Sequence, residues 1–176
     1  MADPPDKTSN YNSFIPDSTG AMVLDDEMSQ QVTLNVSMQQ CLAQANSEGR
    51  LISGFKNVFT FLENNSSELI LFCILPENLW NDSRRKAAFR LVASFCDERR
   101  VRMIKVDDDQ LVRKIIERTS SSQLSAGKAD LSFECVLVLR RWPDQPCCDA
   151  ELLRHHARFP GHDFDNLPLV RLLESS

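Results

Sequence analysis

A run of apolar residues from Leu69 to Leu75 constrains the fold more than any other segment of this chain. A strand with one solvent-facing side alternates apolar and polar residues, whereas a strand that is apolar at every position is buried on both faces. The run therefore predicts the central strand of a sheet that has helices above and below it. In open sheets of this kind, recognition residues lie in the loop beyond the carboxyl end of a strand. We therefore expect function in the segment from Pro76 to Asp82, which carries no catalytic motif.

Helix and strand patterns alternate along a chain of 176 residues, a length that suits one domain with a proper core. Helices are expected from Val32 to Gly49, after Gly54, and over residues 83–100, 107–118 and 148–159. Strands are expected over residues 50–53, 69–75, 101–106, 133–139 and 166–173. The last strand is placed at an edge because Pro168 cannot donate a ladder hydrogen bond. This order predicts an α/β fold, a three-layer α/β/α sandwich around a mixed sheet, in a single domain of residues 32–176.

Residues 1–31 are expected to form a disordered N-terminal tail. They are rich in Pro, Ser, Asp and Asn, and their apolar residues are isolated and follow no period. Such a segment cannot bury enough apolar surface to offset the entropy lost on ordering. The first residues also lack the basic and apolar parts of a secretory signal.

Charge and cysteine content limit the partners and the compartment. The formal net charge is -5, so the overall field does not favour a polyanion such as nucleic acid. No apolar stretch approaches the roughly 20 residues that span a bilayer, so no membrane segment is expected. Six cysteines without a secretory signal indicate a reducing compartment, which is the cytosol, the nucleus or both. Cys41, Cys73, Cys96 and Cys135 lie in apolar patterns and are expected to be buried as small hydrophobes.

The sequence lacks the motifs of common enzyme classes. It has no Gly-rich phosphate-binding loop and no nucleophile elbow. The best metal candidates are two adjacent pairs and one further histidine, and they lack Cys-x-x-Cys spacing: Cys147, Cys148, His155, His156 and His162. Cys148 and His155 are also too far apart on one expected helix to form a nucleophile–base pair. We therefore expect no enzyme activity, no metal and no cofactor.

Two charged runs have structural explanations. Arg84, Arg85 and Lys86, with Arg90 further along, spread over the polar arc of one expected helix and are interpreted as a solvated face. The aspartates at 107–109 precede the next helix, where the helix dipole favours negative charge. Neither run is assigned to a ligand.

The helix expected over 83–100 carries apolar residues at intervals of three and four. They are Ala88, Leu91, Val92, Phe95 and Cys96. A stripe of this kind serves either the core of the domain or a partner helix. Both alternatives remain open for Leu91.

The order and spacing of five short segments resemble the growth-arrest and DNA-damage-inducible stress-sensor family. The resemblance covers roughly residues 34 to 173, nearly everything beyond the expected tail. In that family an apolar strand, a polar loop and a helix ending in a Phe-Cys pair recur in this order. The matching segments are Leu51–Gly54, Leu71–Leu75, Leu91–Glu98, Phe133–Val138 and Leu167–Val170.

The resemblance implies a fold shared with ribosomal kink-turn RNA-binding proteins, together with a non-enzymatic role. Members of the family are stress-induced adaptors of the nucleus and cytoplasm that bind and activate a MAP kinase kinase kinase. They also contact a cyclin-dependent kinase, its inhibitor and the replication sliding clamp. They self-associate through their second and third helices, so a homodimer is expected here. By position, Leu91 matches a self-association residue of the third helix, and Ala88 and Phe95 share its face.

One departure from the family concerns the loop after the central strand. Family members in vertebrates dock partners through a dense acidic run there, whereas this chain has only Glu77 and Asp82, with Trp80 between them. We expect Glu77 and Asp82 to be exposed and to meet basic residues on a partner. Trp80 is either an exposed anchor for the partner or a ring folded back onto the core.

The alternative function is RNA binding of the kink-turn type. In the wider group of this fold, a Gly-x-Asn-Glu-x-x-Lys pattern opens the second helix and touches RNA. The corresponding stretch, Gly54 to Thr60, keeps the glycine and loses the other three residues in place. The sequence therefore favours a protein-interaction module over an RNA-binding one.

Overall fold

The computed structural model describes residues 19–119, 133–141, 149–159 and 164–173, with side chains from Met28 onward. The helices are α1 (Thr19–Ser47), α2 (Phe55–Asn64), α3 (Lys86–Glu98), α4 (Asp109–Thr119) and α5 (Ala150–Arg158). The strands are β1 (Leu51–Ser53), β2 (Ile70–Pro76), β3 (Met103–Val106), β4 (Val136–Leu139) and β5 (Leu169–Val170). Single 3-10 turns η1 (Ser67–Leu69), η2 (Glu77–Leu79) and η3 (Phe164–Asn166) connect some of them.

The described strands form one mixed sheet in the order β1-β4-β2-β3-β5. β2 lies at its centre, parallel to β3 and antiparallel to β4, while β5 forms an edge parallel to β3. Every residue of β2 is buried, which confirms the interpretation of the apolar run. Leu69 is an exception to that run, because it ends the turn η1 and its side chain is exposed.

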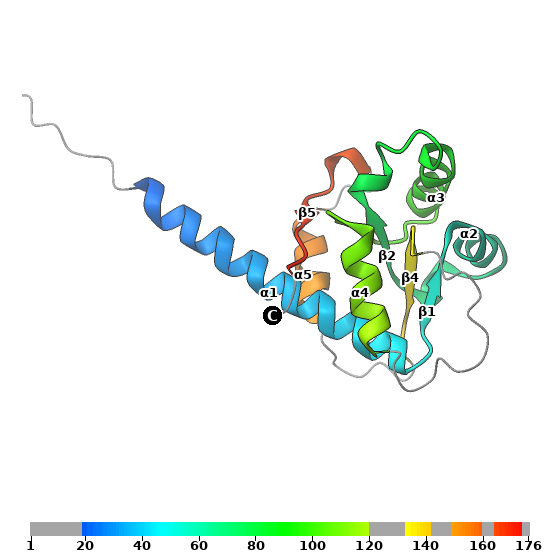
Figure 1. The fold of residues 1–176 in the computed structure, drawn as a ribbon, viewed down its shortest axis with the longest axis horizontal. Helices are drawn as coiled ribbons and strands as arrows, with labels where there is room; N and C mark the ends of the chain where they lie inside the picture. The colour runs from blue at the N-terminus through cyan, green and yellow to red at the C-terminus, as the bar shows by residue number, and fades with distance from the viewer. Residues whose placement is uncertain (1–18, 120–132, 142–148, 160–163, 174–176) are drawn as a thin grey trace, which may run out of the picture.

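Two helical layers cover the sheet, as expected from the sequence (Figure 1). One core lies between the sheet and the layer of α1, α4 and α5, and it contains Phe72 and Ile74 of β2. The second core lies between the sheet and the layer of α2 and α3, and it contains Cys73 and Leu75 of the same strand. From Phe72 to Leu75, successive side chains of β2 therefore enter opposite cores, because successive side chains of a strand point to opposite faces. The three-layer α/β/α sandwich is confirmed.

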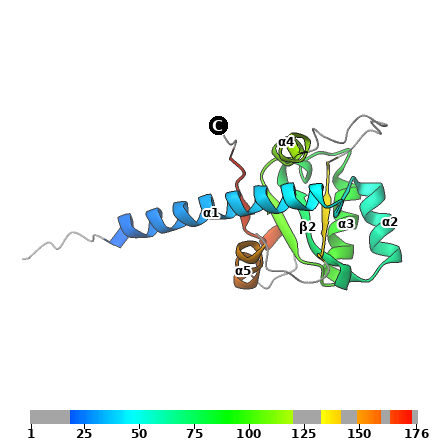
Figure 2. The ribbon, with the colours of Figure 1, turned by 90° about the horizontal axis from the view of Figure 1, so that it is seen from below.

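The boundary expected for the N-terminal tail is wrong. α1 begins at Thr19 rather than at Val32, and its first part extends beyond the body of the domain (Figure 2). The sequence signal for a helix starts at Val32 because the packed part of α1 starts near there, with Leu34 as the first buried residue described. The part of the expected tail before Thr19 lies outside the described residues.

Two glycines flank β1, one after α1 and one before α2. Gly49 follows the helix and has φ 65°. The backbone N–H of Gly49 donates to the carbonyl of Asn46, and the backbone N–H of Arg50 donates to the carbonyl of Ala45. This is the Schellman arrangement, which requires a left-handed residue just beyond the helix. Gly54, with φ 86°, turns the chain from β1 into α2.

The cysteines Cys41, Cys73, Cys96 and Cys135 are free and buried, as expected. A hydrogen bond with Cys96 and burial raise the pKa of the Cys73 thiol, and burial raises that of Cys135. Cys73 and Cys135 are therefore held as thiols, which are poor nucleophiles.

Candidate interaction surfaces

The loop after β2 is firmly held at the carboxyl end of the central strand. Its first residues form η2, and the side-chain amide of Asn78 donates to carboxylate oxygens of Asp108 (3.1 Å) and Asp109 (2.7 Å) at the start of α4. Asp108 also accepts from the backbone N–H of Gln110 (2.9 Å). The loop is thus fixed to a neighbouring element, and the aspartates stabilise a helix start as expected.

Trp80 lies between the two arrangements that the sequence left open, a ring exposed to solvent and a ring folded back onto the core. Its ring packs on the second core, 5.5 Å from the ring centroid of Phe89 and 5.1 Å from that of Phe164. Phe89 and Phe164 contact each other edge to face at 4.8 Å. We call these three rings the aromatic cluster. Trp80 remains only partly buried, so one part of its ring holds the loop to the domain while another stays accessible.

Basic side chains surround the accessible part of Trp80. The Arg90 guanidinium lies 5.1 Å and the Lys86 ammonium 5.8 Å from the centre of its ring. Within the described residues, neither of these cations nor Arg84 has an ion-pair partner. An open cleft of about 370 Å³ adjoins the ring, and its walls carry both signs of charge, Arg90 on one hand and Asp97 and Asp165 on the other, beside Ser94 and Phe164. We call Trp80 with Arg84, Lys86 and Arg90 the tryptophan surface.

The two carboxylates of the loop are engaged within the chain. Glu77 forms an ion pair of 3.5 Å with Lys105, whose side chain is only 10% exposed and lies over the Phe164 ring. Asp82 accepts from the backbone N–H of Arg84 (2.9 Å) and pairs with the Arg85 side chain (3.6 Å). Both side chains keep part of their surface accessible, with 42% of Glu77 and 36% of Asp82 exposed, so the expected exposure holds in part although both charges are already paired within the chain. Their charges are used to hold the loop and α3 in place.

The structure also corrects the apolar stripe expected on α3. Its buried residues are Phe89, Val92, Ala93 and Cys96, whereas Leu91 is 48% exposed. Ala88 and Phe95 are partly buried, and Phe95 contacts Phe59 of α2 at 4.9 Å between ring centroids. Val92 and Cys96 of the expected stripe are buried as expected, and the other buried positions are Phe89 and Ala93 rather than Ala88, Leu91 and Phe95. Leu91 therefore does not belong to the core.

Several residues of the tryptophan surface were not identified as functional from the sequence. Arg84, Lys86 and Arg90 were interpreted as a solvated face, and only the fold brings Lys86 and Arg90 over one aromatic ring. Phe164 lies far along the chain in η3 and had no sequence signal. Its contact with Trp80 depends on the return of the chain beside β3.

Comparison with known proteins identifies no family: no family model matches the chain, and no curated protein is significantly similar to it. Among the described residues, no group of three or more His, Cys, Asp or Glu side chains is placed to hold a metal ion. Cys147, Cys148 and His162 lie outside the described residues, whereas His155 and His156 lie on α5. No helix in the described part is both long and apolar enough to cross a membrane.

Proposed function

We propose that the chain is a non-enzymatic stress-response adaptor that binds and activates a MAP kinase kinase kinase and modulates cell-cycle and DNA-damage responses. The observation that carries this proposal is the tryptophan surface, which a fixed loop presents at the carboxyl end of the central strand. Large aromatic rings and arginines are enriched among residues that dominate binding energy at protein interfaces. The sequence resemblance supplies the partner class, including the cyclin-dependent kinase, its inhibitor and the sliding clamp, and the nuclear and cytoplasmic location.

The charges of the tryptophan surface favour an acidic segment of the kinase. Arg84, Lys86 and Arg90 have no ion-pair partner among the described residues, whereas Glu77 and Asp82 are paired within the chain. Free charges at the rim of an interface steer a partner of opposite sign and accelerate association. The proposed docking site therefore consists of the Trp80 ring and these three cations, with Glu77 and Asp82 positioning the loop.

Arg84→Glu with Arg90→Glu should slow association with the regulatory segment of the kinase by about tenfold or more, and the loss should shrink at high salt. Trp80→Ala should instead raise the dissociation rate, because it removes the apolar contact area. Surface plasmon resonance at two salt concentrations, with the regulatory segments of MAP kinase kinase kinases as analytes, measures both rates. The matched control is Arg113→Glu with Lys114→Glu, two exposed basic residues on α4. Equal slowing by the control pair would place the docking surface elsewhere.

Leu91→Glu should convert the expected homodimer into a folded monomer. Leu91 is half exposed, so a carboxylate there remains hydrated in the monomer but would be buried without a partner in an interface. Sedimentation velocity measures the oligomeric state, and far-UV circular dichroism checks the fold. Val36→Glu on α1 is a matched control, because Val36 is 46% exposed and lies in the other helical layer. A Leu91→Glu protein that stays dimeric would exclude this face as the interface.

A further inference from the structure

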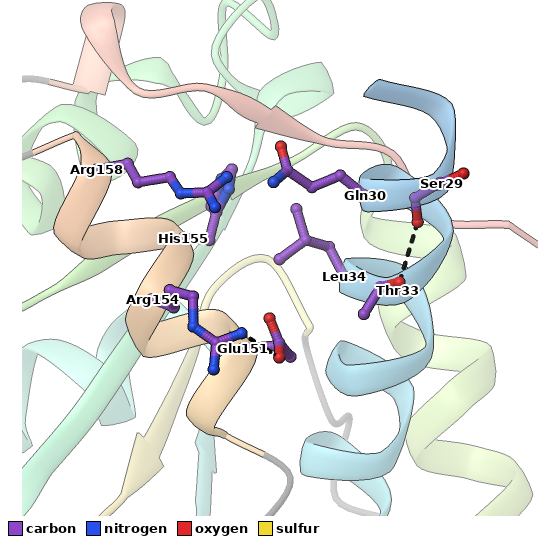
Figure 3. Close-up of a pocket in the computed structure, with 8 residues that line it drawn as sticks. All are labelled: Ser29, Gln30, Thr33, Leu34, Glu151, Arg154, His155 and Arg158. Carbon is purple, nitrogen blue, oxygen red and sulfur yellow. Dashed lines mark hydrogen bonds and ion pairs between the residues drawn. The ribbon is translucent and has the colours of Figure 1, made fainter. Parts of the chain in front are cut away.

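A cleft between α1 and α5 combines features that the proposed function does not use (Figure 3). Its volume is about 280 Å³, and it lies on the opposite side of the sheet from the tryptophan surface. The α5 wall consists of Glu151, Arg154, His155 and Arg158, which follow helical spacing and therefore share one face. The facing wall comes from one and a half turns of α1 that start at Ser29.

The basic groups in the cleft exceed the acidic ones. Arg154 contacts Glu151, so these two charges compensate each other. Arg158 has no ion-pair or hydrogen-bond partner among the described residues, and Figure 3 shows its side chain reaching from α5 toward α1. One guanidinium charge is therefore left over in the cleft. Arginine in this state is suited to a planar or tetrahedral oxyanion, which it binds with two parallel hydrogen bonds.

Uncharged polar groups complete the set of donors. The Nε2 atom of His155 is buried and has no hydrogen-bond partner, which is costly unless a ligand or solvent molecule supplies one. On α1, Gln30 points toward α5 and offers its amide, and Ser29 offers a hydroxyl. Thr33 is bound to the Ser29 carbonyl and contributes an acceptor oxygen at the rim. The donors thus come from both helices and surround the free guanidinium.

We propose that this cleft binds a phosphate monoester. The phosphate oxygens accept hydrogen bonds from Arg158, His155 and the Gln30 amide, and the compensated Arg154–Glu151 pair closes one end. A water molecule occupies roughly 30 Å³ in the liquid, so the cleft has the volume of several water molecules. It therefore has room for more than the phosphate group alone. Leu34 is the apolar residue of the α1 wall; it is 4% exposed, so it offers the carbon part of the ester a small contact at the base of the cleft. This site does not depend on kinase binding.

His155 provides an internal reporter of occupancy. Burial, and then the nearby Arg158 charge, lower its pKa below the usual value. The charged groups of α5 near it are Arg158, Arg154 and Glu151, and the α1 side chains across the cleft are uncharged. A bound dianion offsets the repulsion from Arg158 and stabilises the imidazolium. Binding of the ester should therefore raise the pKa of His155.

The experiment is a titration of the full chain with N-acetyl-O-phosphoserine amide, inorganic phosphate and sulfate at constant ionic strength. The imidazole resonances of the three histidines are followed by NMR. We expect the phosphoserine derivative to saturate His155 below about 1 mM and inorganic phosphate to bind more weakly, because it lacks the carbon contact. If inorganic phosphate binds as tightly, the ligand is free phosphate rather than an ester. If sulfate binds as tightly as the ester, or if the His155 resonance does not move, the proposal is wrong.

Arg158→Gln should weaken binding of the phosphoserine derivative by at least about tenfold, as expected for loss of a charge-assisted hydrogen bond. Arg158→Lys keeps the positive charge but loses the two parallel N–H donors of the guanidinium, so it should restore part of the affinity. Arg158→Gln should also raise the pKa of His155 in the free protein, which reports that the fold around the cleft is kept. Arg113→Gln on α4 removes one charge elsewhere and should leave the affinity unchanged. Equal loss of affinity in the two glutamine variants would contradict the assignment.

Discussion

Phe89→Ala should lower the free energy of unfolding by about 4 kcal/mol, the usual cost of truncating a fully buried phenylalanine. Phe89 is completely buried and contacts three other rings, Phe55 at 6.4 Å and both partners in the aromatic cluster. Its removal leaves a cavity beneath Trp80, which the surrounding helix and loop fill only in part. Urea denaturation followed by circular dichroism measures the change, with the midpoint expected to fall at unchanged slope.

The control for this prediction lies on the same helix. Leu91→Ala should change the free energy of unfolding of the monomer by less than about 0.5 kcal/mol, because Leu91 is 48% exposed. The pair therefore tests the assignment of the buried stripe on α3 without any partner. A larger loss for Leu91→Ala than for Phe89→Ala would mean that α3 is rotated about its axis relative to the arrangement described above.

Glu77→Lys should destabilise the domain by about 2 kcal/mol, because it leaves the buried ammonium of Lys105 without its carboxylate and adds a like charge. For a chain of this size, that loss corresponds to a fall in the melting temperature of about 4–8 °C. Lys105 is 8% exposed, and the Phe164 ring is its other contact, so water cannot easily replace Glu77. Differential scanning calorimetry measures the shift.

Lys105→Met tests whether the loss of stability in Glu77→Lys comes from the ion pair with Lys105 or from other contacts of Glu77. Methionine fills a similar volume without a charge, and Glu77 is exposed enough to be hydrated, so this variant should stay within about 1 kcal/mol of the original. In its background, Glu77→Lys should lose most of its effect, since the buried charge is gone. An equal loss in both backgrounds would show that Glu77 contributes through contacts other than Lys105.

The fold could be predicted from the sequence where one local pattern had one physical solution. The apolar run placed β2 at the centre of the sheet because only burial on both faces tolerates such a strand. Gly49 marked the end of α1 because a left-handed residue is needed there. Pro168 placed the last strand at an edge, where β5 lies. In each case a different local structure would cost free energy within a few neighbouring residues, so the sequence of that segment is enough to exclude it.

The surfaces, in contrast, were decided by the tertiary structure. Leu91 and Phe89 are both apolar residues of α3, and only the packing against the sheet determines that Phe89 is buried and Leu91 exposed. Phe164 and Trp80 contact each other across many intervening residues, and the α1–α5 cleft likewise brings together two segments that are far apart in the sequence. A local sequence pattern shows which residues are apolar or charged. It does not show which distant segment covers them, because that arrangement depends on the free energy of packing the whole core.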